Sequence, residues 1–226
     1  MSIPGDFPDL AYQQLKALVD VHAERVRPIA GEPTLYRQFA LSHNAILWRF
    51  RSAVDADETY RLAYLLPDVS GDTEKRYAQE RALFEFFAAL VSTAEVLCYC
   101  SYAIAGMAND TAFPLVTEKD RRSVDPQLTK EKFAATYPTE AITATLDGML
   151  NTYADANKMR NVLSHRGSPP RATYLGGPKD GHVEWGPFEI DITLTEELRK
   201  WLSQQTHSVV EALCRFSTDH LRKSRL

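Results

Sequence analysis

Residues 86–108 form a long apolar stretch, FFAALVSTAEVLCYCSYAIAGMA, which carries a single charged side chain, Glu95. Its length would suit a membrane span. Its content of Ser, Thr, Tyr, Cys and Ala, with Glu95 in the middle, fits the central helix of a soluble bundle better, because charged residues inside a membrane are rare. A helix that is apolar on nearly all sides is packed by neighbours all round. We therefore predict a buried central helix over residues 74–108, no membrane contact and a cytoplasmic location.

Four other segments also have apolar residues at helical spacing, which adds up to about five helices. These segments cover residues 10–29, 34–66, 139–165 and 195–222. The apolar stripe of the central helix consists of Phe84, Phe87, Ala88, Val91, Ala94, Glu95, Cys98 and Tyr102. Most connections are short enough to make neighbouring helices antiparallel, which predicts an all-α, up-and-down bundle. The length of 226 residues fits a single domain over residues 1–226.

Two segments depart from this helical pattern. Residues 109–138 contain three prolines and form a loop excursion, for which we predict one short helix near residues 129–136. Residues 171–193 change to strand spacing, because Phe188, Ile190 and Ile192 alternate with polar residues. The sequence therefore predicts a small β-hairpin or flap inserted before the last helix.

The overall charge limits how the chain could bind a nucleic acid. The formal net charge is -4 and the sequence pI is near 5.9. A basic nucleic-acid-binding domain normally has the opposite balance. If RNA is a substrate, a local basic patch holds it rather than a field that spans the whole protein.

The cysteines indicate a reducing compartment. Their number is odd, and Cys98, Cys100 and Cys214 all fall in apolar helical stretches, where they are expected to be small buried side chains. No Cys-x-x-Cys pair or Cys/His zinc spacing is present in the sequence. We therefore expect no metal and no other cofactor.

The predicted helix over residues 139–165 has an unusual buried face. Its first turns are apolar, and the residues that define this face are Ile142, Leu146, Met149, Leu150 and Tyr153. The same stripe then continues through Ala156 into the polar side chains of Asn157, Arg160, Asn161 and Ser164. A buried polar group without a partner costs about 1–3 kcal/mol. The polar end of the stripe therefore predicts a bonding partner, a wet pocket or a subunit interface.

This polar end reads K-M-R-N-V-L-S-H-R-G and contains three side chains with useful chemistry. Histidine moves protons near neutral pH, and arginine holds a phosphate and stabilises charge that develops on it. Asn161 and His165 are four residues apart and stack on one side of a helix, whereas Arg160 and His165 are about 140° apart. Arg160 and His165 converge if the helix loosens near Gly167, if the arginine side chain swings across, or if each serves a site shared across a two-fold axis.

The segment R-N-V-L-S-H, from Arg160 to His165, resembles the R-x4-6-H motif of the HEPN superfamily (higher eukaryote and prokaryote nucleotide-binding domains). The resemblance implies a bundle of four to five helices that forms a homodimer with the two motifs facing each other across a cleft. It also implies a metal-independent endoribonuclease of a toxin–antitoxin or phage-defence system, with RNA and an antitoxin or other protein as partners. Carried over to this chain, Arg160 and His165 are catalytic and Asn161 supports them.

Other interpretations of the same residues remain open. Many HEPN domains are catalytically silent, so a helical binding or dimerisation module is the alternative function. Cations at a helix C-terminus also interact favourably with the helix dipole, which would explain His165 without any site. Glu95 is an orienting carboxylate for Arg160 or His165, half of a structural ion pair with a neighbouring Arg or Lys, or exposed on a wide helix face. An unrelated helical protein would point the polar residues of this helix outward.

Overall fold

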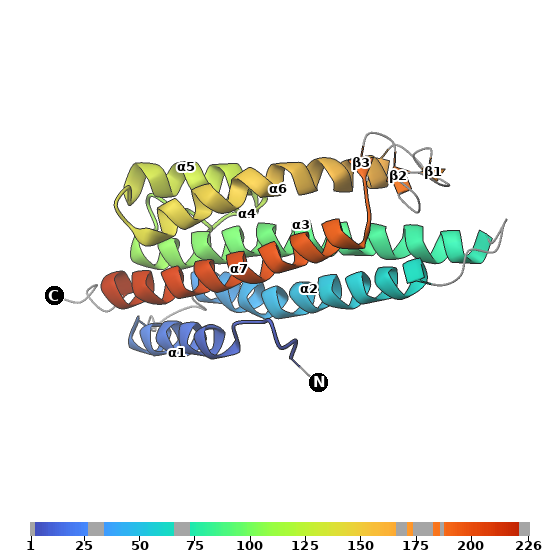
Figure 1. Ribbon diagram of the computed structural model, residues 1–226. Helices are drawn as coiled ribbons and strands as arrows, with labels where there is room; N and C mark the ends of the chain where they lie inside the picture. Colours follow the sequence, from blue (N-terminus) through green and yellow to red (C-terminus); the bar gives the residue numbers. More distant parts are fainter. Residues whose placement is uncertain are drawn as a thin grey trace.

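The computed structural model describes residues 3–26, 34–65, 73–165, 171–173, 183–185 and 188–221, and it shows an all-α architecture (Figure 1). Within this part of the chain there are seven α-helices and one π-helical turn. The helices are α1 (Asp9–Val26), α2 (Thr34–Leu65), α3 (Thr73–Ala108), α4 (Glu118–Ser123), α5 (Pro126–Thr136), α6 (Ala141–His165) and α7 (Ile192–Phe216). The π-helical turn, η1, covers Ser217–Leu221 and continues directly from α7.

The longest packing contact joins α2 and α3, which run antiparallel side by side (Figure 1). Two side-chain hydrogen bonds fix their register. Gln79 donates to the backbone carbonyl of Ala63 at 3.2 Å, and the Tyr99 hydroxyl donates to Gln38 Oε1 at 2.8 Å. Helices α6 and α7 pack against this pair, and α1 lies against α7 and η1.

Helix α3 is the central helix, because it contacts α2, α5, α6 and α7. By length and composition α3 could also cross a membrane, but 61% of its most apolar window is buried inside the bundle. One residue of the predicted stripe is placed differently. Phe84 is 45% exposed, whereas its neighbours Leu83, Phe86 and Phe87 are fully buried, so Phe84 lies on the outward side of α3.

The excursion over residues 109–138 contains two helices, α4 and α5, where one was predicted. Thr117 and Asp120 form a capping box at the start of α4, and the Asp125 side chain caps α5 by accepting from the Leu128 N–H. The excursion is packed into the core through Phe113 and Phe133, which are fully buried. Helices α4 and α5 therefore raise the number of helices from about five to seven.

The segment before α7 contains three short strands in the order β1-β2-β3. They are β1 (Arg171–Thr173), β2 (Val183–Trp185) and β3 (Phe188–Glu189), and both pairings are antiparallel. Helix α7 begins at Ile192, because the Asp191 side chain accepts from the Leu194 N–H and caps the first turn. Ile192 therefore belongs to the helix, although its spacing predicted a strand.

Candidate functional site around Arg160

The last two turns of α6 carry the polar residues that the sequence placed on the buried face. Ala156 is buried, and Asn157 and Arg160 are half-buried. Asn161 and Ser164 are exposed, so the prediction that they continue the core face is wrong. A helix rotates by about 100° per residue, so the buried direction passes from Ala156 to Arg160 and turns Asn161 outward.

Three side chains converge on Arg160 from two helices. The guanidinium Nη2 donates to Asn157 Oδ1 at 2.7 Å and lies 3.6 Å from Glu95 Oε1 on α3. The same Glu95 oxygen accepts a hydrogen bond from the Tyr153 hydroxyl at 3.2 Å. Tyr153 and Arg160 are seven residues apart on α6, a spacing that returns to the same side of a helix after two turns. The structure thus brings Glu95 to Arg160, in a contact that suits both an orienting carboxylate and a structural ion pair.

Arg160 has N–H donors that its contacts with Asn157 and Glu95 do not use. A guanidinium has five N–H groups, and both contacts of Arg160 with its neighbours use Nη2. Its Nε is buried and has no hydrogen-bond partner among the described residues. A buried donor without a partner is unfavourable by about 1–3 kcal/mol. The guanidinium is therefore held in place by Asn157 and Glu95 without being saturated.

Tyr153 stays protonated in this environment. Burial, and after it the negative charge of Glu95, raises the pKa of the Tyr153 hydroxyl well above its usual value. The hydroxyl is consequently a permanent donor to Glu95 over the physiological pH range. The sequence placed Tyr153 on the core face without any site role, although its spacing of seven residues from Arg160 already indicates that both lie on one side of the helix.

The Arg160 cluster forms one wall of a solvent-open groove of about 720 Å³ between α2, α3 and the end of α6. Its polar lining includes Arg49, Ser52, Ser92, Glu95, Arg160 and Ser164. Arg160 is 30% exposed and Glu95 is 41% exposed, so both side chains reach solvent on this wall. The groove offers hydroxyl and guanidinium donors, which are the groups that bind phosphate oxygens. Asn161 is not among its lining residues.

His165 is the last residue of α6, and its side chain lies outside the described part of the structure, as does Gly167. Helix α6 is α-helical up to His165, so the helix does not loosen between Arg160 and His165. On such a helix the two residues point about 140° apart. The predicted loosening near Gly167 falls outside the described residues, and the swing of a side chain and a site shared across a two-fold axis stay predictions as well.

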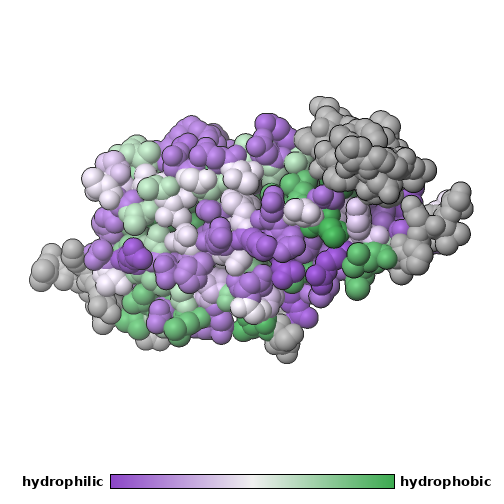
Figure 2. Space-filling model, in the orientation of Figure 1, coloured by the Kyte–Doolittle hydropathy of each residue, from purple (hydrophilic) through white to green (hydrophobic). Residues whose placement is uncertain are grey.

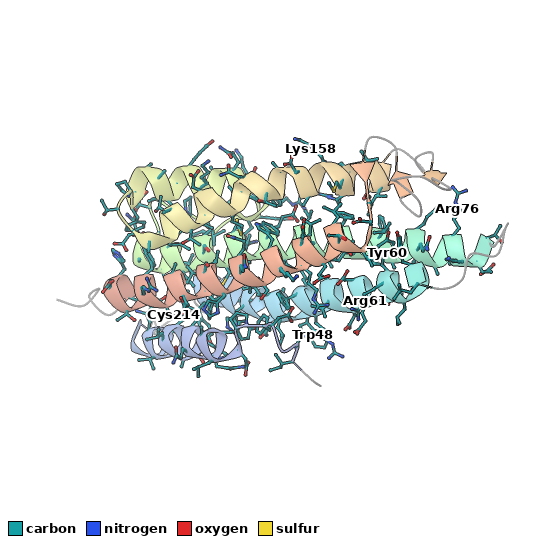
Figure 3. All side chains as sticks on the ribbon, in the orientation of Figure 1. Trp48, Tyr60, Arg61, Arg76, Lys158 and Cys214 are labelled. Atoms are coloured by element: carbon teal, nitrogen blue, oxygen red, sulfur yellow. The ribbon has the colours of Figure 1, made fainter. Side chains whose placement is uncertain are left out.

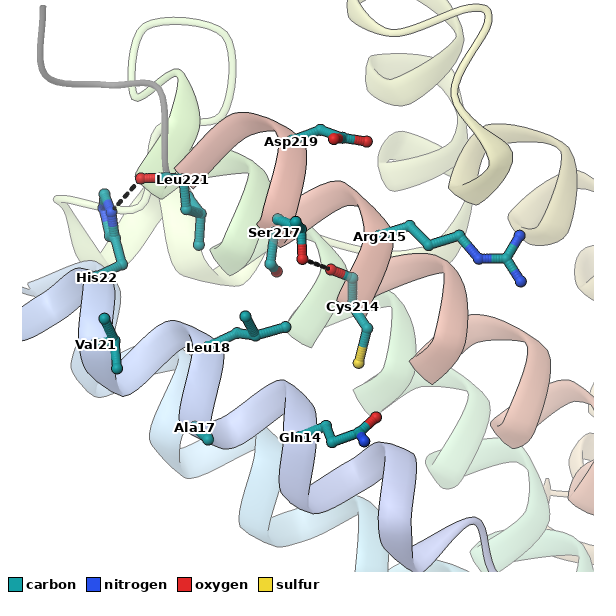
Figure 4. Close-up of a pocket in the computed structure, with 11 residues that line it drawn as sticks. Gln14, Ala17, Leu18, Val21, His22, Cys214, Arg215, Ser217, Asp219 and Leu221 are labelled. Carbon is teal, nitrogen blue, oxygen red and sulfur yellow. Dashed lines mark hydrogen bonds between the residues drawn. The ribbon is translucent and has the colours of Figure 1, made fainter.

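A second and larger groove, of about 880 Å³, lies between α1 and the end of α7 with η1 (Figure 4). Leu18 and Val21 line it on α1, and the buried Ser217 hydroxyl on the opposite wall has no partner among the described residues. His22 Nδ1 lies 2.8 Å from the carbonyl oxygen of Leu221. Figure 2 shows hydrophobic residues along the lower edge of the molecule, where α1 lies. This groove contains none of the residues that the sequence singled out as a site.

The described residues contain no group of three His, Cys, Asp or Glu side chains placed to hold a metal ion. Cys98 and Cys100 are fully buried, and burial raises the pKa of the Cys100 thiol to about 12. Cys214 is half-buried, and burial raises its thiol pKa to about 11. None of the three thiols is therefore an activated nucleophile.

No family model matches the sequence, and neither the curated proteins nor the solved structures contain a significant match to it.

Proposed function

We propose that the protein is a HEPN-like, metal-independent endoribonuclease that acts as a homodimer, in a toxin–antitoxin or phage-defence setting. The observation that carries the proposal is the position of Arg160. Its guanidinium lies on the wall of a solvent-open groove, is fixed by Asn157 and Glu95, and keeps N–H donors for a phosphate. A merely structural arginine would instead be sealed by its neighbours.

In the proposed reaction the substrate supplies its own nucleophile. The 2′-hydroxyl of a ribose attacks the adjacent phosphorus atom, and a base removes the hydroxyl proton. The bond from phosphorus to the 5′-oxygen breaks, and that oxygen receives a proton. The products are a 2′,3′-cyclic phosphate and a 5′-hydroxyl end. No nucleophilic side chain is required, which agrees with the absence of an activated thiol from the described residues.

The residues take different parts in this reaction. His165 is the general acid or base, because imidazole exchanges protons near neutral pH. Arg160 stabilises the charge that develops on the phosphate. Glu95 and Asn157 are positioning residues that hold the guanidinium, and Tyr153 holds Glu95 in turn. Asn161 is exposed on the His165 side of α6 and supports the histidine there.

A catalytically silent binding or dimerisation module is the second candidate. It is favoured by the fact that Arg160 already has an ion pair with Glu95 and a short hydrogen bond to Asn157. Such a network can satisfy polar groups at the end of a core without having any catalytic role. Under this alternative the groove binds a partner and the substitution of His165 changes no catalytic rate.

The test is an RNA cleavage assay with the purified protein in the presence of EDTA, followed by analysis of the product ends. The proposal predicts fragments with 2′,3′-cyclic phosphate and 5′-hydroxyl ends, and no fragments from His165→Ala. Circular dichroism and thermal unfolding of His165→Ala should match the wild type, since position 165 ends a helix. Intact RNA from a diverse pool after incubation with the wild type would refute the enzymatic function.

A further inference from the structure

The charges around the groove leave one guanidinium without a partner. Each carboxylate of the lining is paired with a cation. The pairs are Asp55 with Arg51 at 3.4 Å, Glu85 with Arg81 at 2.8 Å and Glu95 with Arg160 at 3.6 Å. Arg49 also lines the groove and is exposed, and within the described ranges no carboxylate is paired with it. Counted together with Arg51 and Arg81, which lie outside the lining, the groove therefore has one uncompensated positive charge, in a protein whose net charge is -4.

The register of α2 and α3 gives the position of Arg49 along the groove. Ala63 lies beside Gln79 and Gln38 lies beside Tyr99. Interpolation along the antiparallel pair places Arg49 beside Val91, about one helical turn, or roughly 5.4 Å along the axis, from Glu95. Arg49 on α2 and Arg160 on α6 both line this groove, so it presents two guanidinium groups from different helices. Two guanidinium groups on one groove can each bind a phosphate of the same strand.

An aromatic ring lies further along the same groove. Phe84 lines it from α3, two turns beyond Val91, and is 45% exposed. Single exposed apolar side chains are common on protein surfaces, so the place of Phe84 in the groove, and not its exposure alone, is what marks it. Aromatic side chains beside a charged track are the platforms on which nucleic-acid bases stack. Phe84 thus adds a base contact to the two phosphate contacts.

We propose that the groove is a track for a nucleic-acid strand, in which Arg160 holds the scissile phosphate, Arg49 a second phosphate, and Phe84 a base of the same strand. The strand would lie along the contact between α2 and α3. This inference rests on the proposed function, because the reaction at Arg160 defines which phosphate is the scissile one. Arg49 and Phe84 are binding residues here and take no part in the proton transfers.

The test measures binding separately from cleavage. A short fluorescein-labelled, single-stranded 2′-O-methyl RNA cannot be cut by 2′-hydroxyl attack, so its fluorescence anisotropy reports affinity alone. Arg49→Gln should weaken binding about tenfold, as expected for one lost charge-assisted contact. The slope of log Kd against log salt concentration should also fall by about 0.7 for one phosphate contact. Phe84→Ala should weaken binding at least about fivefold, without a change in the salt slope.

Matched controls come from the same two helices. Arg61 is exposed on α2 outside the groove (Figure 3), and Arg61→Gln should bind like the wild type. Tyr77 is an exposed aromatic residue on α3 outside the groove, and Tyr77→Ala should also leave the Kd unchanged. If Arg61→Gln weakens binding as much as Arg49→Gln, the attraction is nonspecific and the track is refuted.

The outcomes separate this inference from the proposed function. If the wild type cuts RNA while Arg49→Gln binds with wild-type affinity, the track is refuted and the nuclease stands. If RNA binds through Arg49 and Phe84 but is never cut, the groove binds a strand without a scissile phosphate, and the nuclease is refuted. If the wild type neither binds nor cuts RNA, both are refuted.

Discussion

At the scale of single residues, His43 shows how a buried polar group creates a pH dependence. Its Nε2 lies 3.1 Å from the Tyr12 carbonyl oxygen, its ring stacks on the Tyr12 ring, and its buried Nδ1 has no partner among the described residues. Protonation would place a donor at Nδ1 that has nothing to bond. Burial is the main cause that lowers the pKa of His43 from 6.5 to about 4.

This shift predicts a loss of stability in mild acid. Between pH 6.5 and 4 the unfolded chain binds a proton at His43 and the folded protein does not, so the free energy of unfolding falls as the pH falls through this window. The contribution reaches about 3 kcal/mol at its lower end. Urea unfolding of wild type and His43→Gln across this range measures it, and the His43→Gln profile should be flatter. A substitution of the exposed His207 should leave the slope of the free energy of unfolding against pH as it is in the wild type. A slope for His43→Gln equal to that of the wild type would contradict the prediction.

Arg160 shows what single residues of the sequence could and could not reveal. The position of Arg160 on the buried side of α6 follows from helical spacing, whereas the contact with Glu95, which the structure shows, was only one of the alternatives that the sequence left open. The sequence alone could not decide whether Asn161 is buried or exposed, because Arg160 and Asn161 both fall near the edge of the apolar stripe. Arg49 and Phe84 were not identified as site residues, since their common groove depends on how α2 packs against α3.

At the scale of elements, the end of α3 depends on a close approach at Gly106. A Cβ at this position would meet the Phe113 carbonyl oxygen at 2.8 Å and Leu35 Cδ2 at 2.9 Å. The missing side chain lets the excursion that carries α4 and α5 lie directly against α3. Its two short helices were hard to predict, because they have few turns and depend on caps and on Phe113 and Phe133 rather than on an apolar period.

Two glycine substitutions separate packing from helix propensity. Gly106→Ala should lower the free energy of unfolding by about 1–3 kcal/mol, since the Phe113 backbone has to move. Gly148→Ala, in α6, should raise it by roughly 0.5–1 kcal/mol, because nothing lies within 4 Å of the added carbon and alanine favours a helix. Chemical denaturation of both variants gives the comparison. A Gly106→Ala protein as stable as the wild type would show that the contact at Phe113 does not restrict this end of α3.

At the scale of the whole molecule, the proposed reaction requires Arg160 and His165 to act on the same phosphate. Helix α6 is α-helical from Arg160 to His165, and five residues of such a helix turn by about 140°. We propose that the site is shared across the two-fold axis of a homodimer, with the arginine from one subunit and the histidine from the other. A symmetric pair of such sites follows from an isologous dimer.

Mixing two inactive variants tests this arrangement. Arg160→Gln and His165→Ala should each be inactive alone, whereas a mixed dimer would keep one site with both residues intact. After subunit exchange the mixture should recover about a quarter of the wild-type cleavage rate, because about half of the dimers are mixed and each has one of two sites. No recovery, with mixed dimers confirmed by native mass spectrometry, would mean that both residues act within one chain.

Single-turnover cleavage by Arg160→Gln measures whether the groove at Arg160 cleaves RNA. Lys158 is the matched control, because it is an exposed cation on α6 that points away from the bundle (Figure 3). Loss of charge stabilisation in the transition state predicts that Arg160→Gln cuts RNA at least about 100-fold more slowly than the wild type, while Lys158→Gln keeps the wild-type rate. Equal rates for Arg160→Gln and the wild type, with the fold intact, would contradict RNA cleavage in the groove at Arg160.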